Sequence, residues 1–348
     1  MTGFSPHGPA LQRAAHLLVT DHMALSAGEG LLLTADTSTD MAAIEAIMNA
    51  AANAGGRPML AMIPKLPFQG KLADPYVPDT LAAAMKEADA WIDLTHPFLA
   101  GSDAHDLALK AGRVRCLGAG GVDGAALARL YGGVDLDSLF ALQSALDELI
   151  AKAEGKECRV TDPLGTDVSF VLSKGTQGKR RQANVPGMNT VPGSVVLLPE
   201  LESVRGTIRV TAAMHEYYTP LATPLTLEVD GLVRGIAERG PEAAVMDRAL
   251  RRAGGGDGYG YVIHFSVGLN PAARYRGNCF IEDIRVPGAN AIGLGKPWWE
   301  PGGGENHPDG IIMRQTLVID GKTILENGII VGPPALAERA RAVQLIYS

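Results

Sequence analysis

The N-terminal part of the chain alternates between short apolar runs and longer Ala-rich stretches. The Ala-rich stretches, such as DMAAIEAIMNAAANAGG (40–56) and DTLAAAMKEADA (79–90), are typical of helices. Strands that alternate with helices form a parallel sheet with both faces covered. The pattern therefore predicts an α/β domain over residues 1–153, with buried strands at GLLLTADT (30–37), RPMLAMI (57–63), AWIDLT (90–95) and RVRCLGA (113–119).

From Cys158 onward, the pattern changes to paired apolar runs that flank turn signals. The runs meet at PLGT in CRVTDPLGTDVSFVLS, at DG in TPLTLEVDGLVRGIAE, and at DG and NG in QTLVIDGKTILENGIIV. Asp-Gly and Asn-Gly between apolar runs are strong hairpin signals. One helical stretch, PEAAVMDRALRRAG (241–254), interrupts the strands. We therefore expect residues 154–348 to form a β-rich α+β domain.

Composition and charge exclude several classes of protein. The 348 residues are enough for two domains with a substantial core. A net charge of −7 offers no basic surface, so no nucleic-acid partner is expected. The sequence contains neither a signal peptide nor a long uncharged apolar window, so no membrane contact is expected. The three cysteines are far apart, which fits a cytoplasmic protein.

The stretch GGGENHPDGI (302–311) sets a histidine and an aspartate, His307 and Asp309, two positions apart. In an extended segment, side chains at this spacing leave the same face and can converge on one object. An imidazole and a carboxylate together suit a divalent metal. The simpler explanation is a polar loop with a turn-forming aspartate. The pair alone leaves both explanations open.

Two further histidines stand where chemistry is common. His264 lies in the apolar run YGYVIHFSVGLNP, where a histidine is usually a hydrogen-bonded core residue. Together with His307 and Asp309, however, it would complete the two imidazoles and one carboxylate that bind non-haem Fe(II). His96 ends the predicted strand of WIDLTHPF, and the carboxyl ends of parallel strands open onto ligand crevices. A capping role is the alternative for His96.

Several segments resemble the M29 aminopeptidase superfamily, which includes the 2,5-dihydroxypyridine 5,6-dioxygenases. The segments are VTDPLGTDVSF, VPGSVVLLPELESVRGTI, GLNP, AIGLG and NHPDG, followed by the hairpin with DG and NG. The similarity covers most of the chain but is dispersed, and only the GLNP and HxD neighbourhoods are specific. It implies an α/β N-terminal domain, a β-rich C-terminal metal-binding domain, and a homo-oligomer, either a dimer or a larger assembly.

Two departures favour the dioxygenase branch over the peptidases, which hold two metals. Ser194 stands where the peptidase motif carries a glutamate, and Asn290 stands where a histidine often precedes the run that resembles AIGLG. Without these donors, too few ligands remain for a second metal. His264, ahead of GLNP, resembles the HxGxGLxP motif of the pyridine-ring dioxygenases. The resemblance therefore assigns iron ligation to His264, His307 and Asp309.

The same resemblance implies further active-site positions. His96 matches a histidine that acts on bound oxygen or as an acid/base. Glu282, in CFIEDIRV, falls near a peptidase ligand or acid, with a salt-bridged surface residue as the alternative. The dioxygenases have a second active-site histidine just before a Trp-Pro, where this chain has Asn189 and Thr190. This departure leaves the identity of the ring substrate open. Three other polar side chains are candidates for substrate contacts: Arg180, Arg181 and Tyr217.

The sequence therefore predicts a mononuclear non-haem Fe(2+) dioxygenase. Its expected substrates are O2 and a hydroxylated aromatic or N-heteroaromatic ring, as in the conversion of 2,5-dihydroxypyridine to N-formylmaleamate. No organic cofactor is expected. One alternative is an M29-like metal-dependent aminopeptidase or amidohydrolase, in which the metal activates water. A metal- or ligand-binding oligomer with a degraded site is the non-enzymatic alternative.

Overall fold

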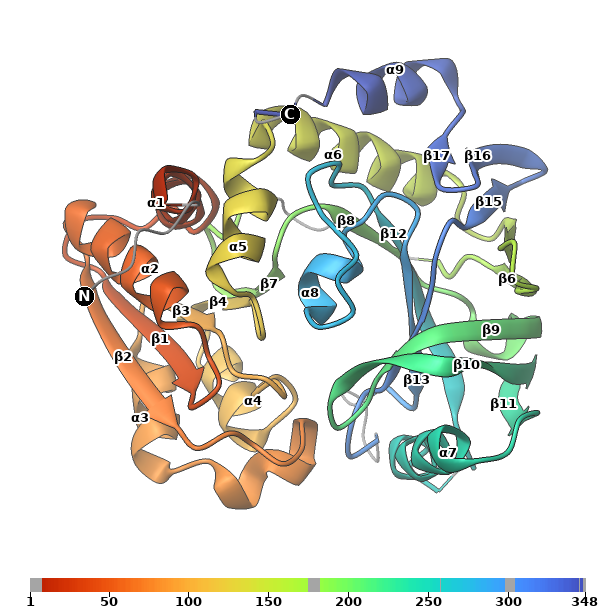
Figure 1. Cartoon of the computed structure of the whole chain (residues 1–348), viewed down its shortest axis with the longest axis horizontal. Coiled ribbons are helices and arrows are strands. Elements are labelled where there is room, and N and C mark those ends of the chain that lie inside the picture. Colours follow the sequence, from red (N-terminus) through yellow and green to blue (C-terminus); the bar gives the residue numbers. More distant parts are fainter. Residues whose placement is uncertain (1–7, 175–181, 257, 298–303, 344, 347–348) are drawn as a thin grey trace. The chain divides into compact units, whose positions relative to one another are not determined.

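The computed structural model describes residues 8–174, 182–256, 258–297, 304–343 and 345–346 (Figure 1). The described residues form two compact units. Of these residues, the first unit holds 8–136, 182–192 and 345–346, and the second holds 137–174, 193–256, 258–297 and 304–343. The units differ from the predicted division after residue 153, because the chain leaves the first unit earlier and returns to it once.

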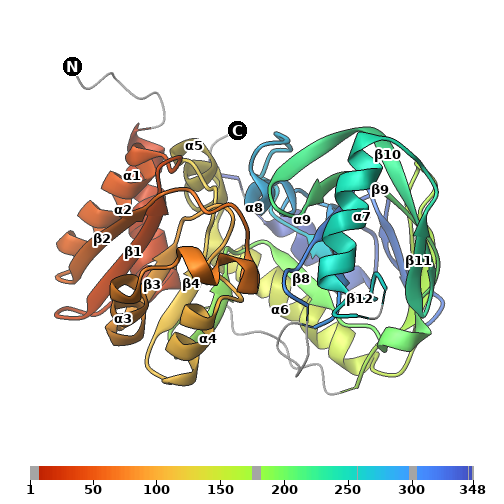
Figure 2. The same ribbon diagram turned by 90° about the horizontal axis from the view of Figure 1, so that it is seen from below.

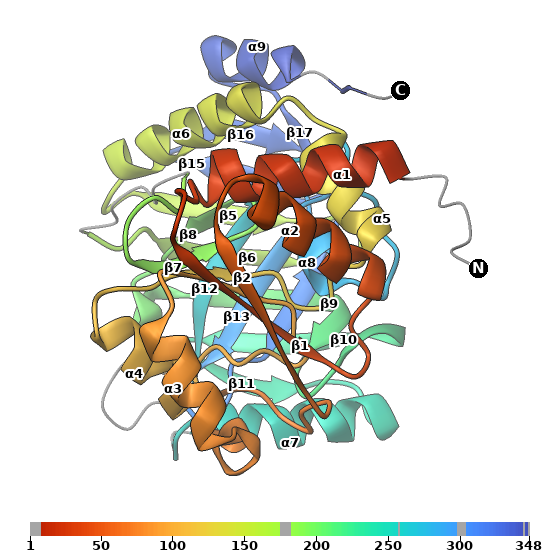
Figure 3. The same cartoon turned by 90° about the vertical axis from the view of Figure 1, so that its left-hand side faces the viewer.

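The first unit is a parallel sheet with helices on both faces, as predicted (Figure 2). Its strands follow the order β2-β1-β3-β4-β7. Helices α1 and α2 pack together, and α3 packs with α4 over a core that contains Trp91 and Met85 (Figure 3). The strands are β1 (Gly30–Asp36), β2 (Arg57–Ile63), β3 (Ala90–Asp93), β4 (Arg115–Gly118) and β7 (Gly187–Thr190). The helices and helical turns are α1 (Gly8–Leu17), η1 (Leu18–His22), α2 (Met41–Asn53), η2 (Gly70–Tyr76), α3 (Asp79–Glu87), α4 (Asp103–Lys110), α5 (Gly124–Leu127) and η3 (Ala128–Gly132).

Strand β7 explains why the chain returns to the first unit. Gly187 pairs with Arg115 and Thr190 pairs with Gly118, so this short segment extends the parallel sheet beyond β4. A strand of four residues with one glycine carries little pattern of its own, and the sequence gives no sign that it belongs to the N-terminal sheet.

The second unit is β-rich, as predicted, and is built on a mostly antiparallel sheet of 12 strands. Strand β10 pairs with both β9 and β11, so strands β9 to β14 close into a ring. The strands are β5 (Glu157–Thr161), β6 (Asp167–Val171), β8 (Ser194–Leu197), β9 (Arg205–Met214), β10 (Tyr218–Asp230), β11 (Leu232–Ile236), β12 (Tyr261–Gly268), β13 (Asn290–Gly295), β14 (Asp309–Ile312), β15 (Thr316–Ile319), β16 (Lys322–Glu326) and β17 (Ile329–Ile330). The helices are α6 (Leu136–Lys152), η4 (Leu201–Ser203), α7 (Pro241–Ala253), α8 (Phe280–Asp283) and α9 (Pro334–Ala342).

The predicted hairpins of the second unit form at the turn signals. Asp320 and Gly321 connect β15 to β16 with φ of 50° and 73°, and Asn327 and Gly328 connect β16 to β17 with φ of 48° and 88°. Two successive positive φ angles define the turn that matches the twist of a hairpin, and Asn, Asp and Gly tolerate them best. Among the described residues, no helix has both the length and the apolar character that a membrane crossing needs.

Candidate metal centre

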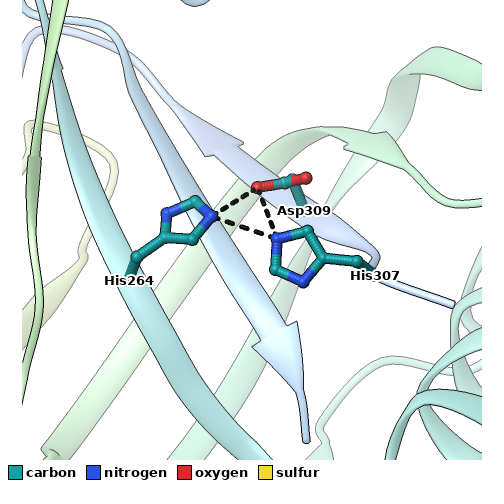
Figure 4. Close-up of side chains that lie close together, drawn as sticks. All are labelled: His264, His307 and Asp309. Carbon is teal, nitrogen blue, oxygen red and sulfur yellow. Dashed lines mark hydrogen bonds and ion pairs between the residues drawn. The ribbon is translucent and has the colours of Figure 1, made fainter. Parts of the chain in front are cut away.

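The register of three strands brings two of the predicted ligands to one face of the sheet. His264 in β12 pairs with Gly293 in β13, and Gly293 pairs with Asp309 at the start of β14. Directly opposite residues of an antiparallel pair share a face. His264 and Asp309 therefore stand on the same face, on either side of Gly293. Figure 4 shows their side chains pointing toward one another.

Gly293 leaves the space that two imidazole rings occupy. A Cβ at this position would lie 2.4 Å from Nε2 of His264 and 2.7 Å from Cε1 of His307. Any side chain here would force both rings away, so the cluster depends on a glycine between His264 and Asp309. The sequence pattern alone does not mark Gly293 as part of the site, although it lies in the AIGLG run.

His307 reaches the same point from the segment that leads into β14. The carbonyl oxygen of Pro308 accepts a hydrogen bond of 2.9 Å from the backbone N–H of Leu294, which holds this segment alongside β13. The predicted convergence of side chains at positions i and i+2 is thus what the structure contains for His307 and Asp309 (Figure 4).

The distances within the cluster suit a metal ion. Nε2 of His264 lies 3.1 Å from Nε2 of His307 and 3.4 Å from Oδ1 of Asp309, and Nε2 of His307 lies 3.9 Å from the same oxygen. Three atoms with these separations lie on a circle of about 2.0 Å radius, so one position can be about 2.1 Å from all three, which is the bond length of first-row metals to N and O.

The electrostatics of the cluster also suit a cation. Burial, and to a lesser extent His264, hold the pKa of His307 well below its usual value, so the ring stays neutral and keeps a lone pair to donate. Burial raises the pKa of Asp309 to about 8, because its carboxylate is desolvated. A divalent cation would restore the stabilisation that the carboxylate loses on burial. The two nitrogens and one oxygen therefore fit a bound divalent metal.

Asn290, which stands where the peptidases often carry a histidine, belongs to a buried hydrogen-bond network. Its Oδ1 accepts from the backbone N–H of Ser266 at 2.7 Å, and its Nδ2 donates to Oε1 of Gln315 at 2.9 Å. Gln315 in turn donates to the carbonyl oxygens of Ser266 and Ala289. This network ties β12 to β13, the strands that carry His264 and Gly293.

Glu282 is fully buried, which contradicts its alternative interpretation as a surface residue. It lies in α8, where Oε1 accepts a hydrogen bond of 3.1 Å from the backbone N–H of Arg274. Its Oε2 lies 3.7 Å from Nη1 of Arg276. Within the described ranges, the cluster that could hold a metal consists of His264, His307 and Asp309 and does not include Glu282.

His96 lies in the first unit, just beyond the carboxyl end of β3. Its backbone N–H donates a hydrogen bond of 2.7 Å to Oδ2 of Asp36, the last residue of β1. Its ring stands edge-on to Phe98, with 5.6 Å between the ring centres. Burial, followed by the charge of Lys65, lowers the pKa of His96 to about 4. The imidazole is therefore neutral at physiological pH.

The remaining candidates for substrate contacts are dispersed. Asn189 and Thr190 lie in β7 of the first unit. Tyr217 is about half exposed, and its ring stands edge-on to that of His215. Arg180 and Arg181 lie outside the described residues.

Comparison with known proteins adds a family and a fold. The family described as 2,5-dihydroxypyridine 5,6-dioxygenase matches residues 19–332, which is most of the chain. The structure of 2,5-dihydroxypyridine dioxygenase from Pseudomonas putida KT2440 is similar over 96% of this chain and 100% of its own, with a TM-score of 0.71 and 18% identity. AmpT from Thermus thermophilus, an M29 aminopeptidase, is similar over 93% of this chain and 99% of its own, with a TM-score of 0.63 and 16% identity. At these sequence identities, the two structures show only that the fold is shared. No curated protein matches the sequence.

Proposed function

The chain belongs to the 2,5-dihydroxypyridine 5,6-dioxygenase family, and we propose that it is an Fe(II)-dependent dioxygenase that cleaves a hydroxylated N-heteroaromatic ring. The observation that carries this proposal is the convergence of His264, His307 and Asp309 on one point. Two imidazoles and one carboxylate are the ligand set of mononuclear non-haem iron oxygenases. The proposed reaction is the opening of 2,5-dihydroxypyridine by O2 to N-formylmaleamate.

Each proposed ligand contributes a different property. Ferrous iron, when bound, would supply a Lewis acid that lowers the pKa of a substrate hydroxyl and offers open positions for the ring and O2. His264 and His307 would hold it through neutral ring nitrogens, which leave the net charge of the ion in place. Asp309 would supply one negative charge. Because burial destabilises an unpaired carboxylate, a bound cation would favour the ionised form of Asp309.

His96 is the residue that we propose as the acid/base. Its pKa of about 4 keeps the imidazole neutral, so it can accept a proton from a substrate hydroxyl at physiological pH. The hydrogen bond from its backbone to Asp36 fixes the main chain from which the ring projects. Glu282 is proposed only as a supporting residue, because its carboxylate already accepts a hydrogen bond from the backbone N–H of Arg274, ahead of α8, and lies near Arg276.

Oxygen consumption tests the proposed function. Protein loaded with Fe(II) in the presence of ascorbate is supplied with a panel of dihydroxypyridines and aromatic diols, and O2 uptake is recorded. We expect one O2 consumed per ring opened, with both oxygen atoms from ¹⁸O2 in the product. Hydrolysis of aminoacyl amides without O2 uptake would instead support the aminopeptidase alternative. Binding of a ring without turnover would support the non-enzymatic alternative.

A further inference from the structure

Two carboxylates hold the loop that carries His96. Asp93, the last residue of β3, accepts hydrogen bonds of 3.1 Å from the backbone N–H groups of Thr95 and Leu99, on either side of the histidine. Asp36, the last residue of β1, accepts one of 2.7 Å from the backbone N–H of His96 itself. Both carboxylates are buried. The main chain is therefore fixed at His96 and on both sides of it.

The turn after β1 fixes the carboxylate of Asp36. Its Oδ1 accepts hydrogen bonds of 2.6 Å from both the backbone N–H and the hydroxyl of Ser38. The backbone N–H of Asp36 donates to Oγ1 of Thr39 at 3.0 Å, and its carbonyl oxygen accepts from the backbone N–H of Thr39 at the same distance. Hydrogen bonds to an ionised group are stronger than those between neutral groups. Asp36 therefore holds its own turn with one oxygen and His96 with the other.

The imidazole of His96 meets few groups that would stabilise a positive charge. A Cβ at Gly121 would lie 3.5 Å from Cγ of the ring, so the ring packs against the backbone there, and Phe98 lies edge-on to it. Within the described part of the chain, its Nδ1 is buried and has no hydrogen-bond partner. Burial lowers the pKa of His96 most, the charge of Lys65 lowers it further, and the charge of Asp36 raises it. Asp36 is therefore the carboxylate whose charge favours the protonated ring.

We propose that Asp36 is a positioning residue for His96: it fixes the loop that presents the imidazole, and its charge stabilises the imidazolium that forms when the ring takes a proton. This inference rests on the proposed function, in which His96 is the acid/base. In that step the O–H bond of the substrate hydroxyl breaks, an N–H bond forms on the imidazole, and the electron pair stays on the substrate oxygen. The aspartate of a Ser-His-Asp triad stabilises its imidazolium through a ring N–H. Asp36 instead acts through the backbone N–H and through space.

Two substitutions of Asp36 separate its hydrogen bond from its charge. Asp36→Asn keeps an oxygen that can accept from the N–H of His96 but carries no charge, whereas Asp36→Ala loses both. In Fe(II)-loaded protein, we expect kcat to fall about 10- to 100-fold in Asp36→Ala, the effect of a displaced catalytic group. Asp36→Asn should lose about three- to tenfold, the effect of one charge across a partly solvated distance. KM and iron content should stay as in the wild type.

A double-mutant cycle separates positioning from a general effect on the fold. If Asp36 acts through His96, its removal costs little once the imidazole is gone. The double variant Asp36→Ala/His96→Ala should then turn over within about twofold of His96→Ala, because residues that act as a unit have non-additive effects. If the two losses multiply instead, Asp36 acts independently of His96 and the inference is wrong.

Amide hydrogen exchange reads the same hydrogen bond without turnover. In the metal-free protein, the backbone N–H of His96 should exchange with D2O about tenfold faster or more in Asp36→Ala than in the wild type, and at a similar rate in Asp36→Asn. Asp89→Ala is the matched control, because Asp89 accepts a hydrogen bond of 2.8 Å from the backbone N–H of Gly30 at the opposite end of β1. It should leave both the turnover and the exchange of His96 unchanged.

Each remaining outcome also decides the inference. A wild-type rate in Asp36→Ala, when His96→Ala is slow, would overturn it and leave the proposed function standing. A wild-type rate in Asp36→Asn would overturn its electrostatic part. If the wild type consumes no O2 with any ring, the proposed function fails, and the catalytic role of Asp36 fails with it. If Asp36→Ala does not fold, Asp36→Asn and the double variant Asp36→Asn/His96→Ala take its place in the same comparison.

Discussion

At the scale of the residue, the pKa shifts of Asp309 and His307 favour a bound cation in the cluster. Asp309 is buried, and its pKa is raised to about 8. Desolvation, and to a lesser extent His264, hold the pKa of His307 well below its usual value. Without a bound metal, a pKa of about 8 keeps Asp309 protonated at neutral pH. Metal binding must therefore release that proton below about pH 8.

The pH dependence of metal-free stability tests this account of Asp309. An acid whose pKa is raised on folding contributes stability that is fully present below its ordinary pKa of about 4 and is lost as pH rises through about 8. Asp309→Asn stays neutral throughout. We therefore expect the melting temperature of the metal-free wild type to fall relative to that of Asp309→Asn as pH rises over this window. Parallel melting curves for the two proteins, measured in a chelating buffer, would contradict the raised pKa.

A second prediction at this scale concerns His96. His96→Ala should bind iron and substrate as the wild type does but turn over roughly 10²–10⁴ times more slowly, the usual contribution of a positioned acid/base. Because the pKa of His96 is about 4, the part of the rate that needs its neutral form is lost only as pH falls through that value. His16→Ala, which removes an exposed histidine, is the control. If His96→Ala turned over at the wild-type rate, His96 would serve only to cap the strand and would not be the acid/base.

At the scale of the element, strand register creates the site. His264 and Asp309 are 45 positions apart in the chain, yet each pairs with Gly293 across one strand boundary. The sequence predicted the close pair of His307 and Asp309, because their spacing is local. It identified His264 through a resemblance to a motif and could not reveal Gly293, because the need for a glycine arises only when three strands lie side by side.

Replacement of Gly293 tests the role of register. Gly293→Ala should place a methyl group against His264 and His307 and so reduce iron occupancy strongly, while β13 stays folded. Gly235→Ala is the matched control, because Gly235 also lies in a strand and a Cβ there meets no atom within 4 Å. Iron content after anaerobic loading, with circular dichroism as the check of folding, gives the answer. Full iron occupancy in Gly293→Ala would show that the rings have room to move.

At the scale of the whole molecule, the fold class was predictable but its division was not. The alternation of strands and helices predicted the parallel sheet, and the Asp-Gly and Asn-Gly turns predicted the hairpins, because both signals are local. The placement of β7 in the first unit depends on pairing with β4, which lies some 70 residues earlier in the chain. The burial of Glu282 likewise depends on contacts that α8 makes only after folding. Homo-oligomeric assembly and a cytoplasmic location stay predictions.

The central claim is that one iron per chain binds at His264, His307 and Asp309. Anaerobic titration of the metal-free protein with Fe(II), followed by desalting and metal analysis, tests it most directly. We expect one iron per chain in the wild type and close to none in His307→Ala, with both proteins folded, since a residue in a connecting segment contributes little to core packing. Two metal ions per chain, or unchanged iron in folded His307→Ala, would contradict the claim.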